Sequence, residues 1–439
     1  MIVTVATSDT LAGVSTDRLL PGGLVTPESL AAYRQAGGYD RDPQAVEPAW
    51  LRAVVTDSGL RGRGGAGFPA GRKWESVAAQ PGRRSVLVNA AESEPASAKD
   101  RVLLTSRPHL VIEGALLAAR AVEAGEVVFY LHDGSRDMRS AVEDAMRDLR
   151  AARIDLPRWR IVTAPARYVA GEESAAVQRA NGRRAKPSFK PPRPFERGVR
   201  GGPTLVQNVE TLANVPPIAR NGPAWLRETG TADLPGTLLV TLSGGVRRPG
   251  VYETVAGTRL EDTIETLGGG TGDGLPAQAI LPGGYFSGWV GGDAIRRGVR
   301  LDRASLAEHG ALLGSGAIAV VPQSVCGLWQ AVYLLRFFAD ESARQCGPCT
   351  FGTAAMADAL ERVAVGQPEP DDLRRLQHYA DAMLPGRGAC GHLDGATIAA
   401  RTALRVFRDD IHRHLARGHC GRSAHCILPG VRGVSDGRR

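Results

Sequence analysis

The sequence predicts an α/β protein in three parts: a parallel sheet covered by helices, a small α+β module, and a C-terminal helical bundle. Up to residue 235, short apolar segments of strand length alternate with amphipathic segments of helix length. From residue 328 onward, apolar residues recur at spacings of three and four. We therefore expect domains at 1–235, 236–325 and 326–418, followed by a flexible tail at 419–439.

In the first domain, strands and helices of ordinary length alternate, which is typical of a parallel sheet with helical crossovers. The strands are expected at 85–89, 127–131 and 160–162, and the helices at 110–122 and 138–149. The segment 183–203 is rich in Pro, Gly and Arg, and we expect it to be a long ordered loop.

The next part has short strands at 237–242, 250–252 and 279–281, with a helix at 259–267. The bundle that follows has three apolar helical faces. Their members are Leu328, Val332, Leu335 and Phe338; Leu373, Leu376, Ala380 and Met383; and Ala400, Leu404, Phe407 and Ile411.

Composition excludes several classes of function. Hydrophobic residues make up 43% and charged residues 23% of the 439 residues, which is ordinary for a globular protein. We expect no membrane insertion, because no apolar segment is long enough to span a bilayer, and the sequence predicts a cytoplasmic location. The net charge of +8 comes mostly from scattered arginines, a pattern that does not indicate nucleic-acid binding.

A glycine-rich loop and the end of a strand are the first candidate ligand site. Glycines allow backbone N–H groups to approach a ligand closely, and a lysine suits a phosphate. Ligands of open α/β sheets bind at the carboxyl ends of strands. The alternative for the loop is a flexible turn. The residues are Gly62, Arg63, Gly64, Gly65, Ala66, Gly67, Lys73, Asn89, Glu92, Ser93 and Glu94.

Two later segments carry similar polar groups. Tyr168 precedes Gly171, Glu172 and Glu173, where the acidic residues begin a predicted helix. Those carboxylates also suit the positive end of a helix dipole without any ligand. Gln207, Asn208 and Thr211 supply amides and a hydroxyl, which would serve equally well as a helix cap.

Taken in order, these segments resemble the flavin-binding subunit of respiratory complex I and of the related NAD-linked hydrogenases and formate dehydrogenases. The family patterns stand at Gly59–Pro69 and at Asn208–Pro216, and the similarity covers roughly residues 25–416. The resemblance implies a Rossmann-like FMN-binding domain, a ubiquitin-like β-grasp (SLBB-type) domain, and a helical bundle that carries an iron–sulfur site.

The resemblance also implies roles for the polar residues. FMN would be held by Gly62–Gly67, Lys73, Asn89, Glu92, Ser93, Tyr168, Gly171, Glu172, Gln207, Asn208 and Thr211. Glu94 and Glu173 would face the nicotinamide nucleotide, NADH or NADPH. The implied reaction is hydride transfer from the nicotinamide to the flavin, followed by single-electron steps to an iron–sulfur cluster.

All six cysteines lie in the last third of the chain. Cys346 and Cys349 form a Cys-x-x-Cys before a predicted helix, and Cys390 follows after the next helix. Their setting in a helical bundle favours an iron–sulfur or zinc site over a redox dithiol. The resemblance implies a [4Fe–4S] cluster held by these three cysteines and a fourth.

The fourth cysteine of the family pattern is replaced by Ala343. The cluster would then be kept with a substitute ligand, for which Cys326 and His392 are candidates, or with three cysteine ligands only. Otherwise it is lost and the cysteines are apolar core residues. Retention of three ligands favours a cluster.

The last two cysteines, Cys420 and Cys426, lie beside His419 and His425. This composition is compatible with a small metal site. We expect a loose tail instead, because the surrounding Gly, Arg and Ser residues show no apolar pattern that would pack.

The nucleotide site departs from the family pattern at three positions. Ser76 and Arg193 replace two phenylalanines that sandwich adenine, and Ala91 replaces an aspartate. Arg193 would stack on adenine or reach a ribose phosphate, which would weaken binding or shift it toward NADPH. The alternative is a flavin that does not use nicotinamide.

The sequence therefore predicts a flavin and iron–sulfur oxidoreductase of the NADH dehydrogenase type. Its expected partners are a nicotinamide nucleotide and a ferredoxin-like or complex-I-like electron-transfer protein. Two alternatives remain open: a ferredoxin-linked flavoprotein that does not use NAD, and an accessory subunit that has lost its redox centres.

Overall fold

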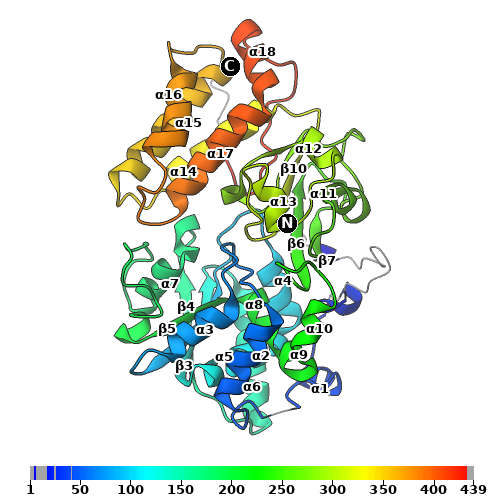
Figure 1. The fold of residues 1–439 in the computed structure, drawn as a ribbon, viewed down its shortest axis with the longest axis vertical. Coiled ribbons are helices and arrows are strands. Elements are labelled where there is room, and N and C mark those ends of the chain that lie inside the picture. The colour runs from blue at the N-terminus through cyan, green and yellow to red at the C-terminus, as the bar shows by residue number, and fades with distance from the viewer. Residues whose placement is uncertain (1–3, 6–16, 24–25, 41, 433–439) are drawn as a thin grey trace. The chain divides into compact units, whose positions relative to one another are not determined.

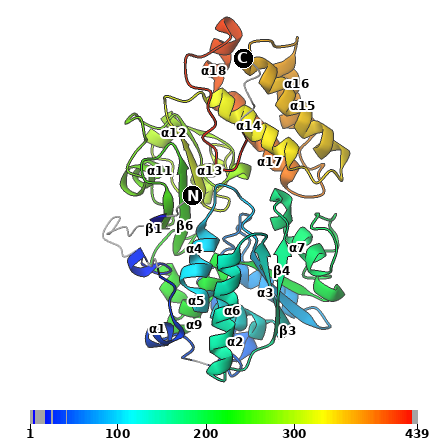
Figure 2. The same ribbon diagram turned by 180° about the vertical axis from the view of Figure 1, so that it is seen from behind.

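The computed structural model describes residues 4–5, 17–23, 26–40 and 42–432 of the chain. They form two compact units, drawn in Figures 1 and 2, and each unit is described separately below. Unit 1 comprises residues up to 93, then 97–240 and 251–257; unit 2 comprises 94–96, 241–250 and the chain from 258.

Unit 1 is built on a four-stranded sheet of order β4-β3-β2-β5, and every strand pair is parallel. The strands are β2 (Arg84–Ala90), β3 (Ala124–His132), β4 (Arg158–Ala164) and β5 (Thr204–Asn208). The predicted parallel sheet is thereby confirmed. The strand β5 was not predicted, because its five residues directly follow the loop 183–203 and lead straight into a helix.

Both faces of this sheet are covered, so its strands carry apolar residues at successive positions. Val86 and Val88 point into a core shared with the helices on one face, including α2 (Pro48–Ser58), α5 (Pro108–Ala121) and α6 (Arg136–Ala151). Leu87 and Tyr130 point to the opposite face, where Ala176 of α7 packs. The predicted helices at 110–122 and 138–149 correspond to α5 and α6.

The helices of unit 1 place its loops and strand ends. They are α1 (Leu30–Gln35), α2 (Pro48–Ser58), α3 (Ala70–Ala78), α4 (Lys99–Ser106), α5 (Pro108–Ala121), α6 (Arg136–Ala151), α7 (Glu173–Ala180), α8 (Val209–Ala213), α9 (Val215–Asn221) and α10 (Pro223–Arg227).

A second sheet contains the predicted short strands. In unit 2, β10 pairs in parallel with the second half of β6 and antiparallel with β8, which pairs with β9. The strands of this sheet are β1 (Thr4–Val5), β6 (Thr237–Gly244), β7 (Gly250–Val255), β8 (Ala279–Leu281), β9 (Val290–Gly291) and β10 (Ala317–Val321). Short helices accompany it: α11 (Leu260–Asp262), α12 (Gly292–Arg296) and α13 (Arg303–Ala307).

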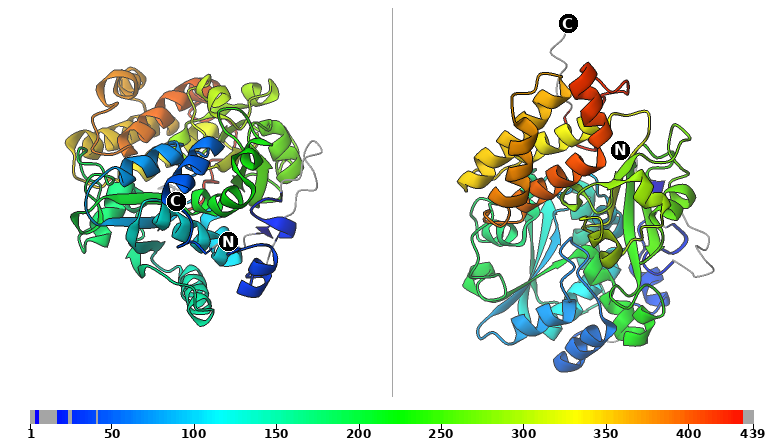
Figure 3. Two further views of the ribbon diagram at one scale, coloured as in Figure 1. Left: turned by 60° about the horizontal axis from the view of Figure 1, so that its bottom comes forward. Right: turned by 45° about the horizontal axis from the view of Figure 1, so that its top comes forward.

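The predicted helical bundle forms the last part of unit 2, where the yellow-to-red helices pack side by side in Figure 3. Its helices are α14 (Gly327–Asp340), α15 (Gly347–Ala364), α16 (Asp372–His378), α17 (His392–Val406) and α18 (Arg408–Arg417). The apolar face predicted through Phe407 is divided between two helices, because Phe407 has non-helical dihedrals (φ −102°, ψ 25°).

The segment after α18 differs from the expected loose tail over its described part. Tyr333 donates a hydrogen bond to the carbonyl of Ala424 at 2.6 Å, and Gln330 contacts both His425 and Ile427. The sequence shows no apolar period here because backbone and polar side-chain bonds hold the segment.

Among the described residues, no single helix has the length and apolar composition required to cross a membrane. The helices α4 and α5 meet that criterion only when taken together, and they are bent by 97° at the break between them.

Candidate functional site

The carboxyl ends of β2 and β5 place two amide side chains next to each other. Asn89 and Asn208 are register partners at the last pairing of these strands. The Asn89 amide donates to the Gly171 carbonyl at 2.8 Å, which ties the strand end to the turn before α7. Asn208 caps α8 by accepting hydrogen bonds from the backbone N–H groups of Glu210 and Thr211.

The glycine loop lies against the same strand end. The backbone N–H of Arg63 donates to the Thr211 hydroxyl at 2.8 Å. A Cβ on Gly64 would lie 3.1 Å from Cβ of Asn208, so the loop approaches the strand end as closely as glycine allows. Gly65 has φ +123°, a conformation that side chains disfavour, and a Cβ there would meet nothing within 4 Å. The loop therefore presents its backbone to open space beside the strand ends.

Two further predicted residues meet at this edge. A Cβ on Gly171 would lie 2.1 Å from the Ser93 hydroxyl oxygen, so any larger residue there would displace the Ser93 side chain. Gly171 ends the 3₁₀ turn that begins at Tyr168. Gln207 is buried at the end of β5, and its amide nitrogen makes no hydrogen bond to any described residue. A buried donor without a partner is costly, and a ligand bound at this edge would offset that cost by accepting its hydrogen bond.

Glu92 is a partly buried carboxyl that organises the start of α4. It accepts hydrogen bonds from the Ser97 hydroxyl at 2.6 Å and from the backbone N–H groups of Asp100 and Arg101, both at 2.9 Å. Burial, and then repulsion from Asp100, raises the pKa of Glu92 to about 7, even though these donors oppose the shift. The group can therefore exchange a proton near neutral pH.

Two lysines and two glutamates form an ion network at the start of α7. Lys190 lies 2.8 Å from Glu172 and 3.0 Å from Glu173, and Lys73 lies 3.2 Å from Glu173. Burial would raise the pKa of Glu173, but the two lysines outweigh that effect and lower it. Glu172 also caps α7 through the backbone N–H groups of Ser174 and Ala175.

Four charged residues of this region were not predicted as site residues. Lys190 belongs to the network above, and three others form a buried triad. Lys99 contacts Glu210 at 2.7 Å and Asp100 at 3.0 Å, and the Asn208 amide donates to Asp100 at 2.6 Å. One feature of the sequence could have indicated these residues, namely the scarcity of lysine. The chain has four lysines, and three of them make the contacts described above.

Glu94, which was predicted to face the nucleotide, belongs to unit 2. Its carboxylate accepts a hydrogen bond from the backbone N–H of Tyr285 at 2.9 Å. A Cβ on Gly284 would lie 2.6 Å from the same oxygen, so glycine is needed for this approach. The position of Glu94 relative to a nucleotide therefore stays a prediction.

The three positions that depart from the family pattern have ordinary local contacts. The Ser76 hydroxyl donates to the carbonyl of Arg72 at 2.8 Å within α3. Arg193 is exposed, and its backbone N–H donates to the Glu196 carboxylate at 2.7 Å. Ala91 is fully buried directly after β2.

The predicted cluster cysteines lie at helix N-termini of unit 2. Cys346 is the residue before α15, and Cys390 lies two residues before α17, which packs against α15. The Ser342 hydroxyl lies 3.3 Å from the Cys349 sulfur. Burial, with a smaller contribution from nearby Cys346, raises the pKa of the Cys349 thiol.

The two suggested substitute ligands have other contacts. One ring nitrogen of His392, Nε2, lies 2.7 Å from the carbonyl oxygen of Phe338. The sulfur of Cys326 lies 3.4 Å from Nε2 of His414. Ser342, directly before Ala343, instead brings a hydroxyl oxygen to Cys349.

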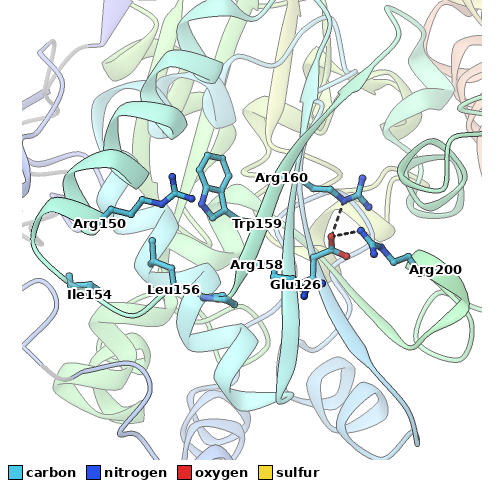
Figure 4. A pocket seen from close by; sticks show the side chains of 9 residues that line it. Glu126, Arg150, Ile154, Leu156, Arg158, Trp159, Arg160 and Arg200 are labelled. Atoms are coloured by element: carbon cyan, nitrogen blue, oxygen red, sulfur yellow. Dashed lines mark hydrogen bonds and ion pairs between the residues drawn. The ribbon is translucent and has the colours of Figure 1, made fainter.

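Two cavities lie elsewhere in unit 1 and contain none of the predicted cofactor residues. The one in Figure 4 has a volume of about 630 Å³ and includes Trp159 and Arg150. Its Glu126 carboxylate is paired with Arg160 at 2.9 Å and Arg200 at 3.2 Å. The other, of about 750 Å³, lies beside α7. Neither is the predicted flavin site.

Comparison with known proteins identifies the family. A model described as the Nuo51 FMN-binding domain matches residues 55–217, and one for the NADH-ubiquinone oxidoreductase-F iron–sulfur binding region matches 329–414. An SLBB domain model matches residues 239–281. The second F subunit of the NADH-quinone oxidoreductase of Rhizobium meliloti is 34% identical over 89% of this chain and 95% of its own. The chain belongs to the family of NADH-quinone oxidoreductase F subunits.

Other similar proteins support the same family assignment. The F subunit of the Escherichia coli NADH-quinone oxidoreductase is 33% identical over 88% of this chain and 89% of its own. Among solved structures, an NAD⁺-reducing [NiFe]-hydrogenase in the air-oxidized state has 32% identity and a TM-score of 0.78, covering 93% of this chain and 67% of that chain. The predicted fold class, with its flavin, β-grasp and iron–sulfur parts, is thus confirmed.

The residues of unit 1 fit an FMN. A Cβ on Gly65 would face open space in the loop beside Asn208, so backbone N–H groups of this loop can reach a phosphorylated ligand. The unpartnered Gln207 amide supplies a further donor. These residues, with Lys73 and Asn89, would hold the cofactor.

The donor set of unit 2 fits an iron–sulfur cluster. Cys346, Cys349 and Cys390 of unit 2 form no disulfide, and Cys349 has an oxygen donor beside it in Ser342. Thiolates are the ligands that these clusters use. Both helix N-termini favour negative charge on the adjacent sulfurs.

Proposed function

We propose that this chain is the NADH-oxidising subunit of an electron-transfer enzyme, holding FMN in unit 1 and an iron–sulfur cluster in unit 2, in the cytoplasm. The observation that carries the proposal is the meeting of Asn89, Gln207 and Asn208 with the glycine loop at one edge of the parallel sheet. This is where open α/β sheets bind ligands.

FMN, when bound, accepts two electrons from a reduced nicotinamide and releases them singly. The chain would position it through backbone N–H groups of Gly62–Gly67 and through Lys73, which suits a phosphate. Glu92, Ser93, Tyr168, Gly171, Glu172, Gln207, Asn208 and Thr211 would complete the flavin site.

The ion network beside α7 would orient the nucleotide. Lys73 and Lys190 keep Glu173 ionised, and an ionised carboxylate accepts hydrogen bonds from ribose hydroxyls or a carboxamide. Arg193 is exposed and offers a planar cation that would stack on adenine or pair with a phosphate. Glu94 would contribute a second carboxylate.

An iron–sulfur cluster with Cys346, Cys349 and Cys390 as ligands would take single electrons onward. The acceptor would be a ferredoxin-like or complex-I-like protein. The net charge of +8 supports an acidic partner, since opposite charges accelerate encounter.

The test is NADH oxidation by the full chain, loaded with FMN and iron, with ferricyanide as electron acceptor. Replacing Glu173 with Gln removes the charge held by the two lysines, and we expect kcat/KM for NADH to fall roughly 10-fold or more, as for loss of a charged hydrogen bond. Glu143→Gln, on an exposed face of α6, is the matched control. Equal kcat/KM values for the two variants would argue against this nucleotide site.

A second candidate function follows from one observation. Ser76 is hydrogen bonded within its own helix and offers no aromatic face to adenine. A flavoprotein reduced by a ferredoxin rather than by NADH would tolerate this change. Reduction of the bound flavin by reduced ferredoxin but by neither NADH nor NADPH would favour this alternative.

A further inference from the structure

Three side chains from separate parts of unit 2 meet at the N-terminus of α14. They are Cys326, which directly precedes α14, His414 of α18, and Cys420 of the C-terminal segment. One sulfur or nitrogen atom of each lies within 4.8 Å of the others. The Cys326 sulfur is 3.4 Å from Nε2 of His414. This spacing is what two ligands of one metal ion require, given metal–sulfur and metal–nitrogen bonds of about 2.3 and 2.0 Å.

His414 is already oriented as a metal ligand. Its Nδ1 lies 2.7 Å from the carbonyl oxygen of Ala364, so Nδ1 carries the proton and donates it to that carbonyl. Nε2 then presents its lone pair to the Cys326 thiol, from which it accepts a hydrogen bond while no metal is bound. Metal-bound histidines usually have such a second hydrogen bond, which fixes the tautomer and the ring orientation.

Cys326 is fully buried, and its sulfur accepts a hydrogen bond from the backbone N–H of Trp329 in the first turn of α14. An ion between the two sulfurs would compensate the thiolate charge, and its binding would release the protons.

The surrounding contacts hold the third ligand in place. Ser423 bonds through its backbone to Ser324 and to Cys326, at 3.0 and 2.8 Å, which brings the C-terminal segment alongside the start of α14. Arg422 pairs with the buried Asp410 of α18 at 3.0 Å. Cys420 therefore reaches the site from an ordered segment.

We propose that Cys326, His414 and Cys420 bind a Zn²⁺ ion that fastens the C-terminal segment to α14 and α18, separately from the iron–sulfur site. Two soft thiolates and an imidazole form a donor set that suits zinc, and hard cations such as Mg²⁺ prefer oxygen. Water would fill the fourth position, because Cys420 is only partly buried.

The test is zinc and iron content per chain, measured by mass spectrometry on the full-length protein. Cys420→Ser is the main variant, since its partly buried side chain allows the fold to form. Cys426→Ser is the matched control, because the Cys426 sulfur, also partly buried, faces the carbonyls of Leu428 and Val431 at 3.9 and 3.8 Å.

We expect one zinc per chain in the unaltered protein and in Cys426→Ser, and loss of zinc from Cys420→Ser with unchanged iron and flavin. Zinc affinity of Cys420→Ser, measured by competition with a chelating dye, should fall at least about 100-fold. Adding Co²⁺ in place of zinc should produce a sulfur-to-cobalt absorption band that Cys420→Ser weakens.

Three results would overturn the proposal. One is equal zinc affinity in Cys420→Ser and the unaltered protein. Another is loss of iron rather than zinc from Cys420→Ser or Cys326→Ser, which would make these sulfurs cluster ligands. The last is a disulfide between Cys326 and Cys420 in protein that takes up no zinc under reducing conditions.

Discussion

Asn89 and Asn208 stand opposite each other at the carboxyl ends of two adjacent parallel strands, β2 and β5. Asn89 donates to Gly171, 82 residues away in the turn before α7, and Asn208 donates to Asp100, 108 residues away in α4. One pair of amides therefore joins segments that are distant in the sequence, and the proposed flavin site is built around it.

Replacing Asn208 with Ala should weaken both the fold and the flavin site. The N-terminus of α8 would lose its cap, which typically costs about 1 kcal/mol in the free energy of unfolding. The bond to Asp100 would also be lost. Chemical denaturation and FMN content per chain measure the two effects. Asn221→Ala, at the exposed end of α9, is the control and should change neither.

The pKa of Glu92 predicts a dependence of stability on pH. In the folded chain this pKa is about 7, above the usual value of 4.5, so the folded state holds the proton more tightly than the unfolded state. Its contribution to stability is complete below about pH 4.5 and is lost as pH rises through about 7.

Glu92→Gln removes this ionisation. Compared with the unaltered protein, the variant should therefore gain relative stability between about pH 5 and pH 7, with little further change above that range. Urea denaturation at several pH values, on protein without added flavin, measures the difference. A difference that stays constant with pH would contradict the raised pKa.

Removing a cysteine ligand of the proposed cluster and adding one should have opposite effects on the cluster. Cys349→Ser should abolish the iron signal, since it removes a thiolate from a site with three. Ala343→Cys should restore the family ligand pattern and make the cluster resist air and chelators longer. Iron and sulfide analysis of both variants provides the measurement. Unchanged iron in Cys349→Ser would rule out this cluster site.

The nucleotide site should gain affinity when its aromatic residues are restored. Each phenylalanine in Ser76→Phe and Arg193→Phe would add a stacking contact of about 1 kcal/mol, or about fivefold in KM for NADH. Steady-state kinetics of each variant and of the double variant test this. If Arg193 instead serves NADPH, Arg193→Phe should raise KM for NADPH, and an unchanged KM for both nucleotides would show that neither position faces the nucleotide.

The sequence predicted the parallel sheet because strands and helices alternate along it, and because β2 and β3, which are covered on both faces, appear as continuous apolar runs. It did not predict β5, which is too short and has no turn before its helix. The glycine loop and Asn208 were recognisable because glycine and helix-cap residues serve local geometry.

The ion pairs were not predictable. Lys190 and Glu173 lie 17 residues apart on a loop and a helix, and no periodicity relates them. The contact of Cys326 with His414 spans 88 residues, and it depends on how α14 and α18 pack. Pairings set by tertiary packing leave no local pattern in the sequence.

The proposed function requires that flavin bound by this chain takes electrons from NADH. The most direct measurement is an anaerobic titration of the FMN-loaded protein with NADH, followed by the flavin absorption band. We predict bleaching that is complete at about one NADH per flavin, since the cofactor accepts two electrons. Flavin that stays oxidised with both NADH and NADPH, yet is reduced by a reduced ferredoxin, would contradict the account.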